Sequence, residues 1–467
     1  MDYHPTFTED TICAISTAPG VGGIAVVRVS GNKAIEITDK IFVSANKKRL
    51  AEAKTQTLHF GNVFDNNNAT VDEVLVSVFR APHSFTGENT TEISCHGSIY
   101  IQQKILQLLT DNGCRLATPG EFTKRAFVNG KMDLSQAEAV ADLIAANSEA
   151  SHKLAINQMR GGISNELQKL RDDLLKFLSL IELELDFSTE DVEFADRMEL
   201  MDLVENIKNK LHELSSSFIK GNAIKNGIPV AIVGKTNVGK STILNWLLND
   251  DKAIVSDVEG TTRDVIEDTF VHNGITFRLT DTAGLRATDD KVEKIGIERS
   301  YNKMEHANII LVVVDATTAK SENISFLKEN IKTTEGRNYA VVVNKSEFLT
   351  EDERNSYNDE LKGICTDVVF ISAKENINKK GLLCILDKYG NITEGENVLV
   401  SNIRHYEALK KAENSIKNVE QGLDLQLSGD LLSLDIHECI DSLGEITGQI
   451  SCDEVLGNIF KNFCIGK

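Results

Sequence analysis

The sequence predicts a multidomain protein of α/β and α class: an N-terminal α+β domain, a helical bundle, and a parallel-sheet α/β domain inserted into that bundle. Short apolar runs separated by turn residues fill residues 1–118. Helical periodicity dominates 119–219 and 389–467, and strand-like and helix-like segments alternate over 220–388. The chain of 467 residues has room for these parts, at roughly 100–200 residues per domain.

The N-terminal segment is predicted to contain a substantial sheet. An apolar run over 24–29 follows a glycine-rich turn, and a second run covers 74–79. A helical pattern over 101–109 interrupts these strands. We therefore expect an α+β domain over residues 1–118.

Helical segments lie on both sides of the α/β segment. Ser135 and Glu138 have the spacing of a capping box, which predicts a helix start at Ser135. Apolar residues at three- and four-residue steps predict one face of a long helix: Leu167, Leu170, Leu174, Phe177 and Ile181. Further helices are expected over 197–218, 401–418, 429–443 and 453–460. Because the α/β segment interrupts this series, helices before and after it are expected to pack together.

The α/β segment carries five apolar runs with the length of buried strands. They cover 229–233, 275–280, 309–314, 339–343 and 368–371. Segments with helical periodicity separate most of them, which is typical of a doubly wound parallel sheet.

Composition excludes several classes of protein. No apolar run reaches about 18 residues, so no membrane span is expected, and residues 1–5 do not resemble a signal peptide. The 8 cysteines form no CxxC pair, which disfavours a zinc ribbon or disulfide framework and predicts a cytoplasmic location. The net charge of −20 implies that any grip on nucleic acid needs a local patch or a partner.

A phosphate-binding loop is predicted at residues 234–241, which fit GxxxxGK(S/T) between a strand and a helix. Glycines let backbone N–H groups curl around phosphate oxygens at a helix N-terminus. Lys240 would reach the β- and γ-phosphate oxygens, and the Ser241 hydroxyl would bind Mg²⁺. The alternative is a chance match in a turn before a helix.

Three further motifs follow strands of the same segment. Residues 281–284 (DTAG) supply an aspartate for the magnesium shell and a glycine N–H for the γ-phosphate. Residues 344–347 (NKSE) and 372–374 (SAK) resemble the guanine-reading loops of Ras-like GTPases. Glu347 stands where those proteins have aspartate. It keeps the carboxylate that accepts two guanine N–H groups, so GTP is favoured over ATP, but its extra methylene leaves the selectivity open.

The catalytic machinery departs from the Ras-like pattern. Residues 260–264 (GTTRD) occupy the place of the first switch, where a threonine binds Mg²⁺ while the γ-phosphate is present. Leu285 follows the DTAG glycine, and leucine cannot orient water as the usual glutamine does. Acidic candidates for that role are Asp289, Asp290 and Glu293; each could instead be a solvated charge.

Over essentially its whole length the chain resembles the MnmE (TrmE) family of tRNA uridine-modification GTPases. The resemblance rests on residues 22–31, 84–88, 92–97, 119–127, 260–264 and 443–448, together with the phosphate loop. The closing residues 463–467 (FCIGK) are the most specific mark. The family implies that the N-terminal domain binds a 5-formyl- or 5,10-methylene-tetrahydrofolate and forms a homodimer. Folate-site positions match Arg28, Glu92, Lys131 and Lys467, which without the resemblance would be taken as surface ion pairs. Cys464 is expected near the folate.

In the GTPase domain the resemblance implies that two copies meet across their nucleotides. A potassium ion then takes the place of an arginine finger, with Asn237, Ser256, Val258 and Thr261 as its ligands. The catalytic residues are expected to be Glu293, which orients the water, with Lys240 and Thr262; Ser241 and Thr262 bind Mg²⁺. The whole expected GTP-binding set is Asn237, Val238, Gly239, Lys240, Ser241, Thr242, Ser256, Asp257, Val258, Glu259, Gly260, Thr261, Thr262, Asp281, Thr282, Ala283, Gly284, Asn344, Lys345, Glu347, Ser372, Ala373 and Lys374.

The implied activity is GTP-dependent addition of a carboxymethylaminomethyl or aminomethyl group at C5 of the wobble uridine of certain tRNAs. A flavoprotein partner, MnmG (GidA), would bring FAD, and GTP hydrolysis would drive opening and closing of the GTPase domains. Two alternatives stay open: a GTPase switch of another class, such as a ribosome-assembly factor, and a folate-dependent enzyme with a vestigial GTPase domain. The intact Lys240, Ser241, Thr262 and Asp281 argue against the last.

Overall fold

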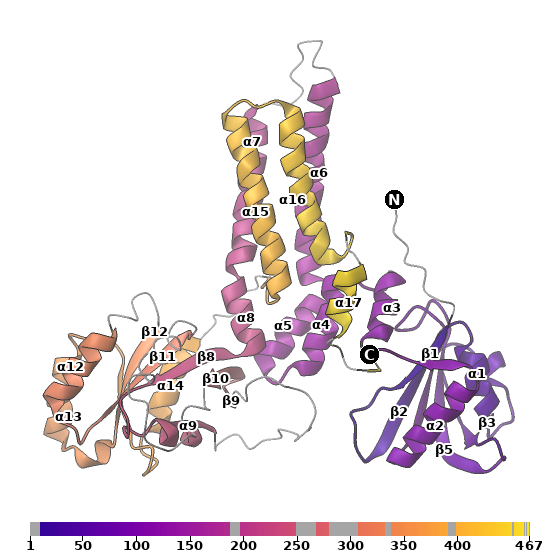
Figure 1. Ribbon diagram of the computed structural model, residues 1–467, viewed down its shortest axis with the longest axis horizontal. Coiled ribbons are helices and arrows are strands. Elements are labelled where there is room, and N and C mark those ends of the chain that lie inside the picture. The colour runs from indigo at the N-terminus through magenta and orange to yellow at the C-terminus, as the bar shows by residue number, and fades with distance from the viewer. Residues whose placement is uncertain are drawn as a thin grey trace. The chain divides into compact units, whose positions relative to one another are not determined.

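The computed structural model describes residues 10–186, 197–248, 268–279, 307–331, 338–390, 398–450 and 453–461, with 463, 465 and 466 (Figure 1). The chain divides into two compact units. The first unit contains Met1–Ile144, Asn157–Lys208 and Lys411–Lys467, and the second contains Ala145–Ile156 and Asn209–Lys410.

The first unit is built on a seven-stranded sheet of order β3-β4-β5-β6-β2-β1-β7. Its strands are β1 (Thr11–Ile15), β2 (Gly22–Ser30), β3 (Phe42–Ser44), β4 (Thr57–Phe64), β5 (Thr70–Phe79), β6 (Thr90–Gly97) and β7 (Cys114–Leu116). Neighbouring strands are antiparallel except β1 and β7, which run parallel. The predicted α+β character of this segment is confirmed.

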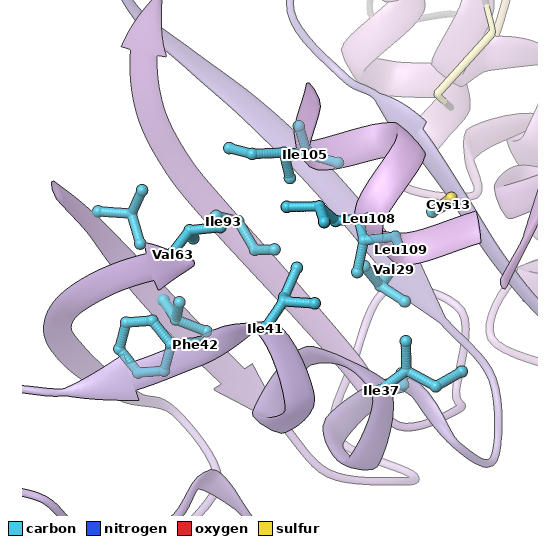
Figure 2. Close-up of a cluster of buried hydrophobic side chains, with 14 of the residues drawn as sticks. Cys13, Val29, Ile37, Ile41, Phe42, Val63, Ile93, Ile105, Leu108 and Leu109 are labelled. Carbon is cyan, nitrogen blue, oxygen red and sulfur yellow. The ribbon is translucent and has the colours of Figure 1, made fainter. Parts of the chain in front are cut away.

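Two helices cover one face of this sheet: α1 (Ala34–Ile41) and α2 (Ile99–Asp111). Figure 2 shows Ile37 and Ile41 of α1 and Leu108 of α2 packing with strand residues such as Val29 and Ile93. Strand side chains alternate between faces, so the opposite face carries the other residues of each strand. Large apolar side chains are exposed on that open face: Ile24, Val43, Leu58, Phe60 and Leu75.

Helices complete the first unit. They are α3 (Glu121–Val128), α4 (Leu134–Ala145), α6 (Gly162–Asp186), α7 (Arg197–Ser216), α15 (Ile403–Asp424), α16 (Gly429–Thr447) and α17 (Asp453–Lys461). Helix α7 ends in the second unit, and α15 and α5 (Glu149–Met159) begin there. The predicted stripe of α6 from Leu167 to Ile181 is buried. Helix α6 packs against α16, and Lys208 of α7 pairs with Glu420 of α15. Helices from both sides of the α/β segment therefore pack together, as expected.

One predicted helix start is wrong. Helix α4 begins at Leu134, and its capping box is formed by Asp133 and Gln136. Asp133 Oδ1 accepts the Gln136 amide at 2.9 Å, while Gln136 Oε1 accepts the Asp133 amide at 2.9 Å. Ser135, the expected cap, lies inside the helix and donates its hydroxyl to Asp133. The earlier start buries Leu134 and Ala137 against Leu456 and Phe460 of α17.

The second unit contains a six-stranded sheet of order β13-β12-β11-β8-β10-β9. Its strands are β8 (Ile228–Val233), β9 (Asp268–His272), β10 (Ile275–Leu279), β11 (Ile309–Asp315), β12 (Asn338–Asn344) and β13 (Val368–Phe370). All neighbours are parallel except β9 and β10. This Ras-like order confirms the predicted parallel sheet; Thr280, the last residue of one predicted strand, lies outside the described residues.

Helices cover both faces of the second sheet. They are α8 (Phe218–Asn226), α9 (Lys240–Leu248), α12 (Lys320–Ile331), α13 (Glu351–Leu361) and α14 (Lys379–Gly390). Val313 packs with α9 and α14, whereas its neighbour Val312 packs with α12 and α13. The strands are thus buried on both sides, which explains why they read as continuous apolar runs. Among the helices of the described ranges, none is long and apolar enough to cross a membrane.

Candidate functional site

The phosphate loop after β8 has the backbone that its sequence predicts. Gly234 passes so close to β11 that a Cβ would lie 2.4 Å from the Val313 carbonyl oxygen. Asn237 and Gly239 have φ of 61° and 94°, in the left-handed region. Lys240 begins α9 and donates its ammonium to the carbonyl oxygens of Gly234 and Lys235, at 2.8 and 2.6 Å. The cation therefore lies across its own loop, where it can exchange carbonyl oxygens for phosphate oxygens.

Asn344 joins the phosphate loop to the SAK loop. Its side chain is buried at the end of β12, donates to the Val238 carbonyl oxygen at 2.9 Å and accepts the Ala373 amide at 3.2 Å. A Cβ on Gly239 would lie 2.3 Å from the Asn344 amide nitrogen, so only glycine fits there. Three motifs that are far apart in the sequence meet at this one amide.

Lys345 is held by an aspartate that the sequence analysis missed. Lys345 has φ of 61°, and its ammonium lies 2.5 Å from Asp315 Oδ2. Asp315 also accepts the Thr317 amide and hydroxyl at 2.8 and 2.7 Å. Burial alone would raise the pKa of Asp315, but the hydrogen bonds from Lys345 and Thr317 lower it. The available signal was a polar residue at the carboxyl end of an apolar strand.

Glu347 lies on a short 3₁₀ helix (Ser346–Phe348) that follows Asn344 and Lys345. The Ser346 amide donates to the Ile371 carbonyl oxygen at 3.0 Å, which keeps this helix next to the SAK loop. One carboxylate oxygen of Glu347, Oε2, is buried and has no hydrogen-bond partner among the residues that the structure describes. Burying such an oxygen without a donor is costly, so the side chain is suited to accept N–H groups from a bound ligand.

Other predicted nucleotide residues have less structural context. Asn237, Ser241, Thr242 and Lys374 are exposed, while Ser372 and Ala373 are buried. Several predicted residues lie outside the described part of the chain: Ser256, Asp257, Val258, Glu259, Gly260, Thr261, Thr262, Asp281, Thr282, Ala283, Gly284, Glu293 and Lys467. Leu285, Asp289, Asp290 and Cys464 lie outside it too. For the predicted metal sites, only Ser241 and Asn237 have a described position.

In the first unit, Arg28 and Glu92 are cross-strand partners of β2 and β6 on the open sheet face. Arg28 contacts Glu92 Oε1 through Nε at 2.9 Å and through Nη2 at 2.8 Å. Its guanidinium lies 5.5 Å from the Phe85 ring centre and 5.7 Å from that of Phe122. Both phenylalanines lie in motifs quoted above, but no role had been predicted for either. Phe122 is fully buried and Phe85 is half-buried, so both rings support the Arg28 guanidinium but only Phe85 has exposed area beside the ion pair.

The C-terminal end of the chain meets the same ion pair. The Gly466 carbonyl oxygen accepts from Ser16 Oγ at 3.0 Å and from Arg28 Nη1 at 3.4 Å. Gly466 has φ of 96°, and a Cβ would lie 2.2 Å from the Ile15 carbonyl oxygen. Lys131 donates to the Pro82 carbonyl oxygen at 3.0 Å, and a Cβ on Gly87, in the loop that carries Phe85, would lie 3.4 Å from the Lys131 side chain.

A buried charge network supports this loop from behind. Arg125, which is 1% exposed, binds Asp10 at 2.7 Å, Glu121 at 3.0 Å and Glu88 at 3.2 Å. Burial alone would raise the pKa of Glu121, yet hydrogen bonds from Arg115, from the Thr118 amide and from Arg125 lower it to about 2. These residues anchor the loop in which Phe85 lies.

Known proteins resemble the chain along its length. Residues 11–131 match the family described as GTP-binding protein TrmE N-terminus, and residues 134–464 match the MnmE helical domain. A protein of Bacteroides thetaiotaomicron named tRNA modification GTPase MnmE is 54% identical over 465 residues, covering 98% of this chain and 100% of that protein. A protein of the same name from Flavobacterium johnsoniae is 52% identical over 464 residues, with 98% and 99% covered.

A solved structure, Era in complex with MgGDPNP and nucleotides 1506-1542 of 16S ribosomal RNA, is 29% identical. It covers 40% of this chain and 66% of that one with a TM-score of 0.28, so the fold rests on the strand order described above. The matches to both family models and to full-length relatives show that the chain belongs to the MnmE family.

Proposed function

We propose that this protein is a GTP hydrolase that acts in tRNA modification. The observation that carries the proposal is Asn344, whose buried amide bonds both to the phosphate loop at Val238 and to the SAK loop at Ala373. A nucleotide bound across the phosphate loop and the SAK loop would be recognised at both its phosphates and its base. Full-length relatives named tRNA modification GTPase supply the biological setting.

GTP is the nucleotide that the base side favours. Glu347 Oε2 is buried without a donor in the described part of the chain, and guanine offers two adjacent N–H groups where adenine offers none in that arrangement. A carboxylate that accepts both would recover the cost of its burial only when guanine binds.

The phosphate side would supply catalysis. Lys240 would leave the Gly234 and Lys235 carbonyl oxygens for the β- and γ-phosphates, and Ser241 with Thr262 would hold Mg²⁺. Glu293 would orient the attacking water, since Leu285 cannot. A potassium ion held by Asn237, Ser256, Val258 and Thr261 would supply the charge of the absent arginine finger once two GTPase domains meet. The exposed position of Asn237 on the phosphate loop suits a shared ion.

The first unit would bind a 5-formyl- or 5,10-methylene-tetrahydrofolate. The residues fit such a group, because Glu92 can accept from a pterin N–H edge while the half-buried Phe85 offers a flat apolar contact beside Arg28. Lys131 and Lys467 would meet the carboxylates of the folate tail. The folate would supply the one-carbon unit, and the protein would orient it.

Further partners complete the proposal. Residues such as Ile24 and Phe60, 70% and 53% exposed, lie on the open sheet face and support a homodimer through this domain. An MnmG (GidA) flavoprotein would bring FAD. The flavoprotein would also supply much of the binding surface for tRNA, because a chain of net charge −20 has little excess positive charge for the phosphates. The product would be the carboxymethylaminomethyl or aminomethyl wobble uridine, made in the cytoplasm, where tRNA is found.

Mass analysis of wobble uridines tests this function. Cells that lack the protein should lose the C5 modification, and the intact gene should restore it. A Lys240→Ala variant should fail to restore it, because the phosphates lose their principal cation. Unchanged uridines in the deletion strain would refute the proposed role in tRNA modification, and restoration by Lys240→Ala would refute the need for GTP.

A further inference from the structure

Strands β9 and β10 form a hairpin that lies, in sequence, between the two predicted switch motifs at 260–264 and 281–284. The strands pair along their whole length, from Leu279 opposite Asp268 to Ile275 opposite His272. In nucleotide switches both flanking segments respond to the γ-phosphate. A displacement of either one would therefore act on the same two-stranded ribbon.

The turn of this hairpin is bound to residues 145–156. The Thr276 hydroxyl, which is buried, donates to Asn147 Oδ1 at 3.0 Å. The Ala150 amide donates to the Gly274 carbonyl oxygen at 3.2 Å. Gly274 has φ of 76°, and a Cβ there would lie 3.3 Å from Glu149 Cβ, so the turn sits directly against the start of α5.

The start of α5 does not need Asn147 for its own capping. Ser148 and Ser151 cap each other: Ser151 Oγ accepts the Ser148 amide at 3.1 Å and Ser148 Oγ accepts the Ser151 amide at 3.2 Å. These two bonds satisfy the backbone N–H groups of Ser148 and Ser151, which are donors that an N-cap side chain usually pairs with at a helix start. The Asn147 side chain is thus left for the hairpin, and the first-turn amide of Ala150 finds its acceptor there.

The other side of the hairpin is held by the α/β core. Asn273 donates to Asp387 Oδ2 of α14 at 2.8 Å, and His272 lies 3.2 Å from the same oxygen. Phe270 and Phe277 stack with ring centres 5.3 Å apart. Strand contacts therefore tie the hairpin to the nucleotide-binding sheet, while its turn touches residues 145–156. These residues cluster with the second unit although the chain on both sides of them belongs to the first.

We propose that Asn147 and Thr276 are positioning residues that pass the nucleotide state from the hairpin to residues 145–156. The proposal rests on the proposed function, since it requires that the α/β domain bind GTP and GDP. Helix α5 continues from this segment to Met159, so a change at its first turn is carried along a helix. The hydrogen bond from Thr276 and the bond from Ala150 are the two contacts that transmit it.

Hydrogen exchange of the full-length protein tests the proposal, with GDP compared with a non-hydrolysable GTP analogue in Mg²⁺ and K⁺. Amides of residues 149–152 should exchange at rates that differ by about 5-fold or more between the two nucleotides, the lower end of measured allosteric couplings. Asn147→Leu and Thr276→Val should each reduce the difference, because they remove the acceptor and the donor of one of the two contacts. Asn147→Asp and Thr276→Ser keep those groups and should retain it. Asn147 is exposed, so its substitution leaves the fold intact.

The outcomes separate the two proposals. Failure of the unaltered protein to bind either nucleotide would refute the proposed function. Nucleotide binding without a rate difference at residues 149–152 would overturn the inference alone. It would also be overturned if the conservative variants lost the difference as fully as Asn147→Leu and Thr276→Val. A merely structural contact would change exchange equally with both nucleotides and would lower the melting temperature instead.

Discussion

Replacing Glu347 with glutamine should weaken guanine-nucleotide binding and shift the base preference. The buried Oε2 of Glu347 has no donor among the described residues, so its hydrogen bonds to a ligand do not replace bonds to any of them. Two bonds from guanine N–H groups to a carboxylate are charge-assisted, whereas the glutamine carbonyl oxygen offers a neutral acceptor and its amide opposes one N–H. We expect a loss of about 2 kcal/mol, or roughly 30-fold in Kd.

The same substitution should favour xanthine. Xanthine carries a carbonyl in place of the guanine amino group, and the glutamine amide can donate to it. The assay is calorimetric titration of the purified full-length protein with GDP, xanthosine diphosphate and ADP. Glu347→Asp is the matched control: it keeps the carboxylate, shortens the side chain by one methylene, and should retain the preference for GDP over ADP. An unchanged Kd for GDP in Glu347→Gln, or equal binding of GDP and ADP by the unaltered protein, would refute the assignment of Glu347 as the base-reading group.

Four further predictions concern catalysis, pH and assembly. GTP turnover should rise strongly when K⁺ replaces Na⁺, and Asn237→Ala should remove most of the rise, because that side chain is a proposed potassium ligand. Glu293→Ala should leave GTP binding unchanged and lower turnover by about 100-fold or more, the range for a lost group of this kind; binding and single-turnover assays separate the two effects. The pKa of Glu121 falls from 4.5 to about 2 on folding. Its contribution to the free energy of unfolding, about 3 kcal/mol, is therefore fully present above pH 4.5 and is lost as pH falls towards 2. In Glu121→Gln the midpoint of denaturation should depend less steeply on pH between 4.5 and 2 than in the unaltered protein. Phe60→Asp on the open sheet face should shift the protein from dimer to monomer in light scattering without lowering its helix content.

Each of these has a contradicting result. Equal turnover in both salts would exclude the potassium site, and near-normal turnover of Glu293→Ala would give the water-orienting role to another group. If the denaturation midpoint of Glu121→Gln fell as steeply with pH as that of the unaltered protein, other carboxylates would account for the loss of stability in acid. A Phe60→Asp protein that stays dimeric would place the dimer contact elsewhere.

Local sequence was enough where neighbouring residues make the structure themselves. The phosphate loop was predictable because Gly234, Gly239 and Lys240 belong to one turn, and the buried stripe of α6 was predictable because its period is that of a helix. The start of α4 was not. Asp133 with Gln136 and Ser135 with Glu138 both have capping-box spacing, and packing of Leu134 against α17 selects the first pair.

The sequence by itself determined the fold class, the phosphate loop and the strand-end loops, since these follow from periodicity and from backbone conformations open to particular residues. Tertiary structure alone decided which distant groups meet: Asn344 between two loops, Asp315 on Lys345, and Gly466 on Arg28. It also decided that Asn147 serves the hairpin through Thr276 rather than its own helix. Partners this far apart in the chain are chosen by the packing of sheets and helices, and a single sequence carries no local signal of that choice.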